Sequence, residues 1–317
     1  MPQMSAHVSV SRDHGGGLDA AIAQYGGVRS DWLDLSTGIN PHAYPVGDVP
    51  AGAWQQLPDR SAFDRLEKAA RAFWSVPDDA AVLAAPGASS IIARIPTLAA
   101  PGVVDIPAPT YNEHAAAFQQ TGWQVGTGGT ARVLVHPNNP DGRLWHDPGF
   151  NRPLTVIDES FCDVVLGVSH IAQAPRPGVV ILKSFGKFWG LAGLRLGFAI
   201  GEPKLIARLR DSLGPWQVSG PALTIGATAL EDMRWANRMR QQLAVDAARL
   251  DAMVMHKGAD LKGGTALFRL YEVDDAAKWQ KRLAKRKVWS RTFPYSKTWL
   301  RLGLPPSDRW AQLERAV

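Results

Sequence analysis

Short apolar runs alternate with amphipathic stretches over residues 51–201, a pattern typical of alternating strands and helices. Residues 66–74, for example, carry apolar positions at helical spacing. The runs predicted as buried strands are AAVLAAP (80–86), GVVDIP (102–107), ARVLVHP (131–137), LTVIDES (154–160) and VVILKSF (179–185). Apolar strands that are separated by helices form parallel sheets with both faces covered. The pattern therefore predicts an α/β fold with a mainly parallel sheet flanked by helices.

The pattern changes after Pro221. Residues 226–258 carry an apolar stripe at helical spacing and are predicted as one long amphipathic helix. The segments predicted beyond it are strands in TALFRLYEV (265–273), KVWSRTF (287–293) and TWLRLGL (298–304), a basic helix at 278–287 and a closing helix at 307–317. We therefore expect a large domain over residues 45–225, a smaller C-terminal α+β domain over residues 226–317, and an N-terminal arm, residues 1–44, that joins the small domain.

Composition limits the class of protein. Of 317 residues, 45% are hydrophobic and 20% are charged, which is typical of a soluble globular protein. No apolar run approaches the roughly 18 residues of a spanning helix, and the N-terminus lacks the basic start and apolar core of a signal peptide. Cys162 is the only cysteine, so no intrachain disulfide can form. We expect a cytoplasmic protein without a membrane partner.

The formal charge of +6 raises the question of a nucleic-acid partner. The dense basic run KWQKRLAKRK (278–287) spreads its cations around a solvated helix face, with Trp279 and Leu283 on the other face. We therefore expect no nucleic-acid binding. A moderate positive excess suits an anionic small substrate equally well.

Residues suited to catalysis follow several of the predicted strands. Ligands collect at the carboxyl ends of parallel strands, so Gly87, Asn139, Asp158 and Lys187 are expected to share one site. Lys187 lies between aromatic residues in SFGKFWGLAGLRLGF (184–198), and apolar neighbours or a nearby cation lower the pKa of a lysine and make it a nucleophile towards aldehydes. A carboxylate such as Asp158 keeps a pyridine nitrogen protonated. The pair therefore fits a pyridine cofactor that bears an aldehyde.

A phosphate tail on such a cofactor would need a receptor for a dianion. Arg195 offers a bidentate fork, Ser184 offers a hydroxyl, and the turn at Gly87 opens a helix whose free amides favour phosphate. Tyr111 is expected to stack on the ring, and Asn139 to donate to the ring hydroxyl. The residues expected to hold the cofactor are Gly87, Ala88, Ser89, Tyr111, Asn139, Asp158, Ser184, Lys187 and Arg195, with Lys187 and Asp158 as the catalytic groups.

Most of these residues also have an ordinary structural interpretation. A lysine in a glycine-rich loop is usually solvated, and Asp158 could cap the end of its strand. Tyr111 could pack as a buried aromatic residue. NNPDG, which contains Asn139, is also a good turn sequence.

The motifs together resemble the fold-type I pyridoxal-phosphate enzymes, in their aminotransferase class I and II branch. The resemblance rests on GASS (87–90), APTY (108–111), HPNNPDG (136–142), VIDESF (156–161) and SFGKFWGLAGLRLG (184–197), which occur in the family's order. It implies pyridoxal 5'-phosphate as the cofactor, with Lys187 as the lysine that binds its aldehyde. It also implies a homodimer with the site near the interface, and no metal ligands.

Within this branch, nearly the whole chain is similar to the threonine-phosphate decarboxylases of cobalamin biosynthesis. The similar segments are DHGGGLDAAIAQYG (13–26), WLDLSTGINPHAYP (32–45), GGTALFRL (263–270) and FPYSKTWLRLGLP (293–305). Phe161 stands where wider aminotransferases usually have a tyrosine. This similarity implies decarboxylation of L-threonine O-3-phosphate to (R)-1-aminopropan-2-yl phosphate. The alternatives are an aminotransferase that acts on histidinol phosphate with 2-oxoglutarate, and a non-catalytic relative that keeps the fold.

The resemblance also implies substrate-binding residues. Arg301 matches the family's carboxylate-binding arginine, and Asn139 lies beside the cofactor. His14 and Asn40 are candidates for the substrate's phosphate or carboxylate, although His14 could equally cap its glycine-rich turn. Arg291 could join them, with a solvated surface position as the alternative.

The sequence departs from the family pattern in two places. Gly186 precedes Lys187 where serine or threonine is usual, which removes one possible hydrogen bond to phosphate. QQLPD (55–59) lacks the tyrosine that reaches the partner subunit's phosphate in relatives. No cross-subunit phosphate ligand is therefore assigned.

Overall fold

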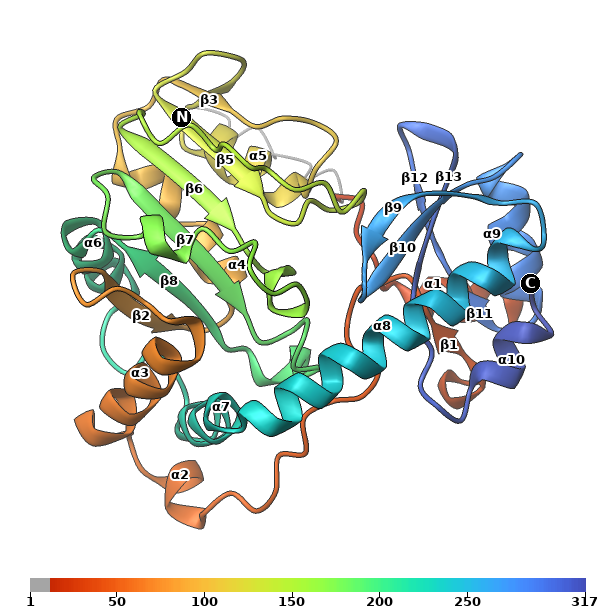
Figure 1. The fold of residues 1–317 in the computed structure, drawn as a ribbon, viewed down its shortest axis with the longest axis horizontal. Helices are drawn as coiled ribbons and strands as arrows, with labels where there is room; N and C mark the ends of the chain where they lie inside the picture. Colours follow the sequence, from red (N-terminus) through yellow and green to blue (C-terminus); the bar gives the residue numbers. More distant parts are fainter. Residues whose placement is uncertain (1–11) are drawn as a thin grey trace, which may run out of the picture.

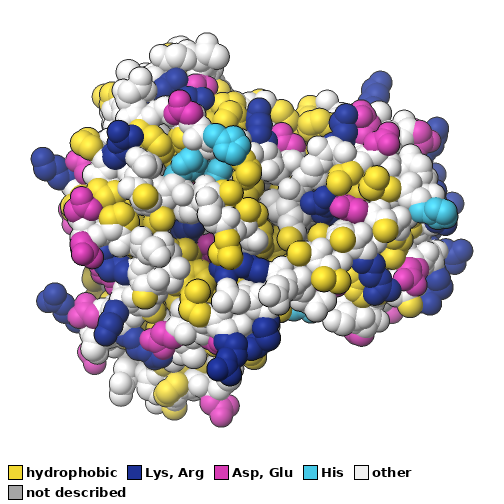
Figure 2. Space-filling model, in the orientation of Figure 1, with side chains coloured by type: hydrophobic (Ala, Val, Ile, Leu, Met, Phe, Trp, Pro, Cys, Tyr) yellow, Lys and Arg dark blue, Asp and Glu magenta, His cyan; other side chains and the backbone are white. Residues whose placement is uncertain are grey.

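The computed structural model describes residues 12–317, which form two lobes (Figure 1). Residues 1–11 lie outside the described residues. They include the start of the predicted N-terminal arm and of the N-terminal stretch in which no signal-peptide pattern was found. Within the described chain, no helix is both long and apolar enough to cross a membrane. On the face shown in Figure 2, acidic and basic side chains are interspersed and do not gather in one broad basic patch.

A seven-stranded sheet forms the centre of the larger lobe, in the order β2-β8-β7-β6-β5-β3-β4. Its strands are β2 (Ala81–Ala85), β3 (Val103–Asp105), β4 (Gln124–Val125), β5 (Ala131–Val135), β6 (Leu154–Asp158), β7 (Val179–Ser184) and β8 (Gly197–Gly201). Neighbouring strands from β4 to β7 pair in parallel, and β8 runs antiparallel to both β7 and β2. The predicted apolar runs all form strands, and the mainly parallel sheet is confirmed.

Helices cover both faces of this sheet. They are α3 (Arg60–Trp74), α4 (Ala88–Ile92), α5 (Asn112–Gln120), α6 (Pro203–Leu213) and α7 (Gly220–Glu231), and the short α2 (Ala51–Gln55) packs on α7. Successive residues of β8 face opposite cores: Phe198 and Ile200 pack with α3 and α7, whereas Ala199 packs with α4, α5 and α6. This alternation follows from the two-residue period of a strand. It explains why the strands of this sheet are apolar on both sides.

The smaller lobe contains a four-stranded antiparallel sheet in the order β12-β13-β10-β9. Its strands are β9 (Asp260–Thr265), β10 (Phe268–Glu272), β12 (Arg291–Phe293) and β13 (Ser296–Gly303), and its helices are α1 (Leu18–Tyr25), α9 (Ala276–Lys285) and α10 (Trp310–Glu314). β1 (Leu33–Asp34) pairs in parallel with β11 (Val288–Trp289), so the chain that precedes the larger lobe adds a strand to the smaller one. The predicted smaller C-terminal sheet domain is confirmed.

The single helix predicted over residues 226–258 is wrong. α7 ends at Glu231, and α8 (Met233–Met255) begins after Asp232. Asp232 has a non-helical ψ of 70°, and its side chain accepts a hydrogen bond from the Trp235 amide at 2.9 Å. Aspartate is a preferred N-cap because it satisfies a free amide of the first turn. After this break, α8 runs from the larger lobe to the smaller one (Figure 1).

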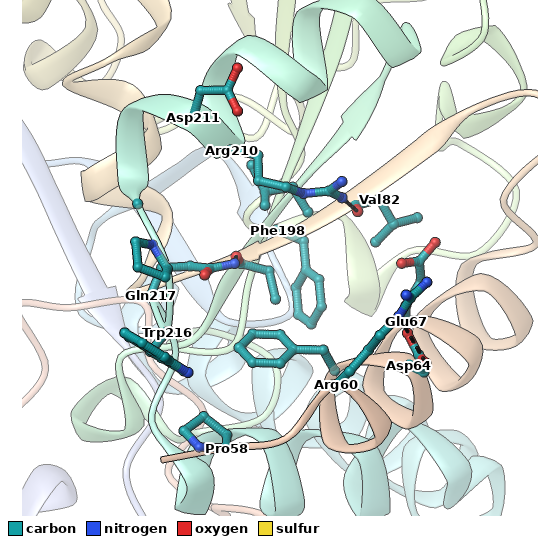
Figure 3. A pocket seen from close by; sticks show the side chains of 15 residues that line it. Pro58, Arg60, Asp64, Glu67, Val82, Phe198, Arg210, Asp211, Trp216 and Gln217 are labelled. Carbon is teal, nitrogen blue, oxygen red and sulfur yellow. Dashed lines mark hydrogen bonds and ion pairs between the residues drawn. The ribbon is translucent and has the colours of Figure 1, made fainter.

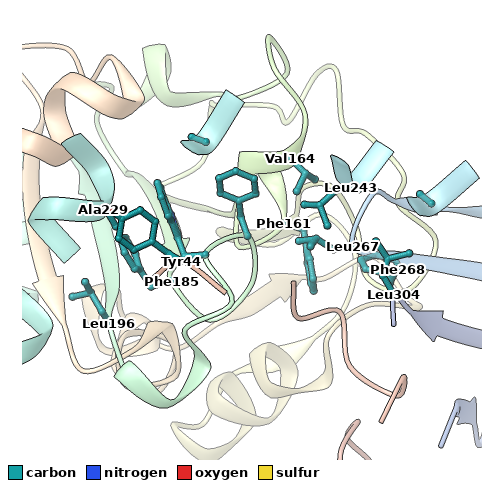
Figure 4. Packing of buried hydrophobic residues seen from close by; sticks show 14 of the residues in the cluster. Tyr44, Phe161, Val164, Phe185, Leu196, Ala229, Leu243, Leu267, Phe268 and Leu304 are labelled. Carbon is teal, nitrogen blue, oxygen red and sulfur yellow. The ribbon is translucent and has the colours of Figure 1, made fainter. Parts of the chain in front are cut away.

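One apolar core continues from the larger lobe into the smaller one. Phe161 follows β6 and Phe268 lies on β10, and their ring centroids are 4.9 Å apart (Figure 4). Gly38 lies against both rings, because a Cβ at this position would come within 2.9 Å of each. The two lobes therefore meet through packed side chains directly beside the ends of the parallel strands.

Candidate active site

Lys187 and Asp158 come together because Asp158 is the last residue of β6 and Lys187 follows the neighbouring strand β7. They line a cavity of about 120 Å³ at the carboxyl ends of the parallel strands. Other predicted residues that line it are Ala88, Ser89, Tyr111, Asn139, Ser184 and Arg195. The structure therefore gathers most of the predicted cofactor-binding residues around one cavity.

Lys187 lies in surroundings that favour its neutral amine. Burial, reinforced by the charges of Arg301 and Arg195, lowers the pKa of Lys187 to about 8, although the charge of Asp158 acts in the opposite direction. The Phe161 ring centroid lies 5.2 Å from Nζ. A lysine with this pKa offers the reactive amine near neutral pH, which an ordinary surface lysine does not.

Asp158 is held by a residue that the sequence reasoning missed. Its carboxylate is 2% exposed and contacts His114 Nε2 through Oδ2 at 2.9 Å. The Ser160 hydroxyl and amide donate to Oδ1 at 2.5 and 3.0 Å. Burial opposes ionisation, but the hydrogen bonds from His114 and Ser160 outweigh it and keep the pKa of Asp158 below its ordinary value. Asp158 is therefore a carboxylate at the floor of the cavity.

Tyr111 stands at the wall of the same cavity. It is the residue before α5, and its ring lies edge-on to His114 with centroids 6.0 Å apart. Burial, together with the charges of Glu113 and Asp158, raises the pKa of Tyr111 to about 12, so the phenol stays protonated. A half-buried, neutral aromatic side chain here fits contact with a planar ring.

The part of the cavity beside Arg195 is suited to an anion. Gly87 precedes the first turn of α4 with φ +81°, and a Cβ there would lie 2.5 Å from Arg195 Nη2. Arg195 itself adopts a left-handed conformation (φ 55°), and its Nη1 donates to the Ala192 carbonyl at 3.0 Å. Ser184 and the first residues of α4, Ala88 and Ser89, line the same cavity as Arg195. A guanidinium, a hydroxyl and free helix amides together suit a phosphate group.

The structure gives a steric reason for the glycine at position 186. A Cβ at Gly186 would lie 3.3 Å from the Ala192 Cα, which is backbone and cannot easily move away. Its amide donates to the Ser184 hydroxyl at 3.3 Å. The serine or threonine that is usual at this position would therefore be crowded here.

A second cavity, of about 270 Å³, adjoins the first and shares Tyr111 and Asn139 with it. Arg301 of β13 enters this cavity although it is only 5% exposed. Its Nη2 donates to the Ser36 carbonyl at 2.7 Å, its Nη1 donates to Asn139 Oδ1, and its Nε has no partner within residues 12–317. Burial, together with the charge of Arg291, lowers the pKa of Arg301 to about 10. The hydrogen-bond partners of Arg301 are neutral oxygens, so its positive charge remains available to pair with an anion.

Arg291 lies beside Arg301 and is already paired. Both of its terminal amino groups donate to the Asp13 carboxylate, at 2.6 and 2.7 Å, and Nη1 also donates to the His14 carbonyl at 2.6 Å. His14 Nε2 contacts Glu113 Oε1 at 2.7 Å. Asp13, His14 and Arg291 all line the second cavity.

The structure does not bring Asn40 into this group. Its side-chain amide donates to the Phe188 carbonyl at 2.7 Å, and its side-chain oxygen accepts from the His42 amide at 2.9 Å. Its own backbone amide donates to the Lys187 carbonyl at 3.0 Å. Asn40 thus supports the loop that carries Lys187, and it lines neither cavity.

A buried ion cluster lies behind the strand ends. Lys183 Nζ is 2.7 Å from Glu159 Oε2 and 3.5 Å from Asp163 Oδ1, and all three side chains are buried. Burial opposes the charge of Lys183, but the two carboxylates outweigh it and raise its pKa. Because successive strand residues face opposite sides, Asp158 faces the cavity while Glu159 faces this cluster.

A larger cavity, of about 750 Å³, is separate from both of these (Figure 3). It lies along the edge strand β2 and is lined by Phe63, Arg210 and Trp216, among others. It shares no lining residue with the cavities that contain Lys187 and Arg301. Its size therefore does not make it the catalytic site.

The family described as aminotransferase class I and II matches residues 133–317. The chain belongs to this family. A threonine-phosphate decarboxylase from Sinorhizobium sp. is 39% identical over 92% of this chain and 93% of the relative. The threonine-phosphate decarboxylase of Pseudomonas aeruginosa is 36% identical over 96% of this chain and 97% of the relative.

Solved structures of aminotransferases share the fold of this family member. The histidinol-phosphate aminotransferase of Sinorhizobium meliloti in complex with pyridoxal-5'-phosphate has a TM-score of 0.82 and 16% identity, with 99% of this chain and 98% of that chain covered. The L-threonine-O-3-phosphate decarboxylase of Porphyromonas gingivalis has a TM-score of 0.73 and 17% identity, with 89% and 97% covered. The predicted family, fold and pyridoxal 5'-phosphate cofactor are confirmed by these comparisons.

Proposed function

We propose that this protein decarboxylates L-threonine O-3-phosphate to (R)-1-aminopropan-2-yl phosphate in cobalamin biosynthesis. The main support is the identity of 36–39% to two threonine-phosphate decarboxylases over almost the whole chain. The geometry fits this substrate class, because the cavity beside Lys187 and Asp158 adjoins a second cavity with two arginines. A phosphorylated amino acid carries two anionic groups that such arginines bind well.

The first cavity fits pyridoxal phosphate by the chemistry of its side chains. Lys187 supplies an amine with a lowered pKa, Asp158 supplies an ionised carboxylate, and Arg195 with the start of α4 supplies an anion cradle. When bound, the cofactor supplies an electron sink for the bond that breaks at the substrate's Cα. The Asp158 carboxylate would accept a hydrogen bond from the protonated ring nitrogen, and His114 holds that carboxylate through its other oxygen, Oδ2.

The remaining steps belong to Lys187 and Arg301. With a pKa of about 8, Lys187 Nζ can hold or release a proton near neutral pH, so it can deliver the proton that replaces the lost carboxylate. Arg301 would orient that carboxylate with a bidentate contact. Which bond breaks depends on its orientation to the cofactor ring, so Arg301 acts on the choice of reaction as well as on affinity.

The test compares products. We expect the purified protein with pyridoxal phosphate to release carbon dioxide from L-threonine O-3-phosphate without any keto acid. Turnover of histidinol phosphate that depends on 2-oxoglutarate would instead support the aminotransferase alternative. That alternative also has a relative, a histidinol-phosphate aminotransferase of Mycobacterium tuberculosis that is 35% identical over 45% of this chain.

A lysine variant separates the enzyme from a non-catalytic relative. Lys187→Ala should abolish carbon dioxide release and the cofactor absorbance band that borohydride removes in the wild type. Lys257→Ala, at an exposed lysine at the end of α8, is the matched control and should keep both. A wild-type spectrum that stays unchanged after incubation with the cofactor would contradict the enzymatic function.

We further propose a homodimer that uses the surface around the 750 Å³ cavity beside β2 (Figure 3). Trp54, Leu57 and Trp216 lie on or next to the segments that line it and are 69%, 64% and 55% exposed. Large apolar side chains exposed together are typical of protein interfaces. Light scattering should give the mass of a dimer for the wild type, and Trp54→Glu should shift it towards a monomer. A monomeric wild type would overturn this proposal.

We also propose the division expected from the sequence, a large domain, a smaller C-terminal domain and an N-terminal arm counted with the smaller lobe, with the boundary placed at the break at Asp232, because α7 packs as a whole on the larger lobe. The pairing of β1 with β11 and the packing of α1 on α9 support that assignment of the arm.

A further inference from the structure

Two arginines share one face of the smaller sheet. Arg291 and Arg301 are directly opposite each other in the antiparallel pair of β12 and β13, and both line the second cavity. Opposed residues of an antiparallel pair project to the same side, and two like charges there destabilise the sheet. An anion that pairs with either guanidinium group therefore relieves this repulsion.

The two arginines differ in how they are neutralised. The partners of Arg301 are the Ser36 carbonyl and Asn139 Oδ1, which are both neutral. Arg291 is held by the Asp13 carboxylate through both of its terminal amino groups. One position for a substrate anion is therefore open, and the other is occupied by a carboxylate of the chain itself.

A phosphorylated amino acid brings one anion for each arginine. Its carboxylate is suited to the open Arg301, so its phosphate is left for Arg291. We infer that Asp13 is a tethered competitor that holds the place of the substrate's phosphate on Arg291 and determines which side-chain anions can bind there. This inference rests on the proposed substrate class.

The Asp13 carboxylate can be displaced from Arg291. Its side chain is 44% exposed, whereas that of Arg291 is 12% exposed, so the carboxylate can turn into solvent while the guanidinium stays in the cavity. The backbone on either side is held in place, because the Asp13 carbonyl accepts from Asn112 Nδ2 at 2.9 Å and the Gly16 amide donates to the Ser36 hydroxyl at 2.7 Å. Displacement of the carboxylate therefore needs only a rotation of the Asp13 side chain.

The competition has a consequence for specificity. A tethered carboxylate acts at an effective concentration of about 1 mM or more, so a weakly bound side-chain anion gains nothing by competing with it. A phosphate carries a charge of about −1.5 to −2 and three acceptor oxygens, and it therefore binds an arginine fork more strongly than a carboxylate does. A side-chain anion of the substrate must therefore bind Arg291 more strongly than Asp13 does. The carboxylates of ordinary acidic amino acids do not meet this requirement.

The test is the sign of the change in affinity when the competitor is removed. We expect Asp13→Asn to lower the KM for L-threonine O-3-phosphate about fivefold, because the substrate no longer displaces a charged partner. The dissociation constant of L-threonine, which lacks a phosphate, should stay unchanged when it is followed by the absorbance of the bound cofactor. Asp13→Ser should behave in the same way, and Asp19→Asn, at an exposed carboxylate on α1, is the control that should alter neither value.

If Asp13 only orients Arg291, Asp13→Asn raises the KM for the phosphorylated substrate, and that result or an unchanged KM overturns the inference. Binding of L-threonine O-3-phosphate is also followed by cofactor absorbance, without turnover. Absence of carbon dioxide release from the wild type would therefore refute the proposed function, while the inference about Asp13 would still be decided by the binding constants.

Discussion

Replacing His114 with phenylalanine tests the support of the catalytic carboxylate. His114 Nε2 lies 2.9 Å from Asp158 Oδ2, and both side chains are buried. Because an ionised carboxylate only accepts hydrogen bonds, His114 must be the donor. A hydrogen bond to a buried charge contributes about 1.5–3 kcal/mol. Its loss favours the protonated form of Asp158 by that energy, so cofactor binding should weaken by up to about tenfold to 150-fold where the variant is protonated and the wild type is ionised, since 1.4 kcal/mol is about a factor of ten.

The pH dependence gives the direction of the effect. In the wild type the pKa of Asp158 is lowered, so the carboxylate stays ionised as the pH falls. Without His114, burial raises this pKa against less opposition, and Asp158 should take up its proton at a higher pH. The acid side of the profile for cofactor affinity should then shift to higher pH in His114→Phe.

The measurement is a titration of the apoprotein with pyridoxal phosphate at several pH values, followed by absorbance. His114→Gln keeps an amide donor on the side chain and should recover part of the affinity, and His256→Gln, at an exposed histidine after α8, should match the wild type. Equal affinity and an unshifted acid limb in His114→Phe would refute the reasoning.

Three further predictions concern the cofactor cavity and its support. Gly87→Ala should lower cofactor affinity at least tenfold, because the new Cβ meets the Arg195 side chain. Gly128→Ala, which also has positive φ but open space around it, should keep the wild-type affinity, and equal affinities for the two variants would contradict the steric argument. The rate at which the apoprotein captures pyridoxal phosphate should rise through about pH 8, where Lys187 loses its proton; a midpoint near 10.5 would contradict the lowered pKa. Lys183→Met should reduce the free energy of unfolding by about 3–5 kcal/mol in a denaturant titration, because it leaves buried carboxylates unpaired; a change below about 1 kcal/mol would contradict this.

Much of the cavity could be predicted because its residues follow strands. A strand ends at a recognisable change from apolar to polar residues, and parallel strands present these ends at one edge. Lys187 and Asp158 were therefore found from local sequence and simple topology. Arg301 was found differently, from the resemblance, since its strand belongs to the other lobe and no local pattern links it to Asn139.

The residues that were missed or misplaced depend on tertiary packing. His114 reaches Asp158 from α5, and its one signal in the sequence is its position three residues after Tyr111, whose ring it contacts edge-on. Asn40 has a polar side chain near a proline, but its partners are backbone groups of the Lys187 loop, which cannot be deduced before the fold is known. The break at Asp232 was hidden because the apolar stripe continues on both sides of the cap.

The hydrogen bond between Arg301 and Asn139 joins the two lobes inside the second cavity. In the proposed complex, Arg301 of the smaller lobe binds the substrate's carboxylate while Lys187 and Asp158 of the larger lobe contact the cofactor, so the angle between the lobes would set how that carboxylate stands relative to the cofactor ring. The choice of the Cα bond that breaks would then depend on a rigid-body coordinate of the whole molecule. Substitutions at the distant junction of α7 and α8 would then redirect the chemistry, towards carboxylate loss or towards proton loss, without altering any side chain that touches the substrate.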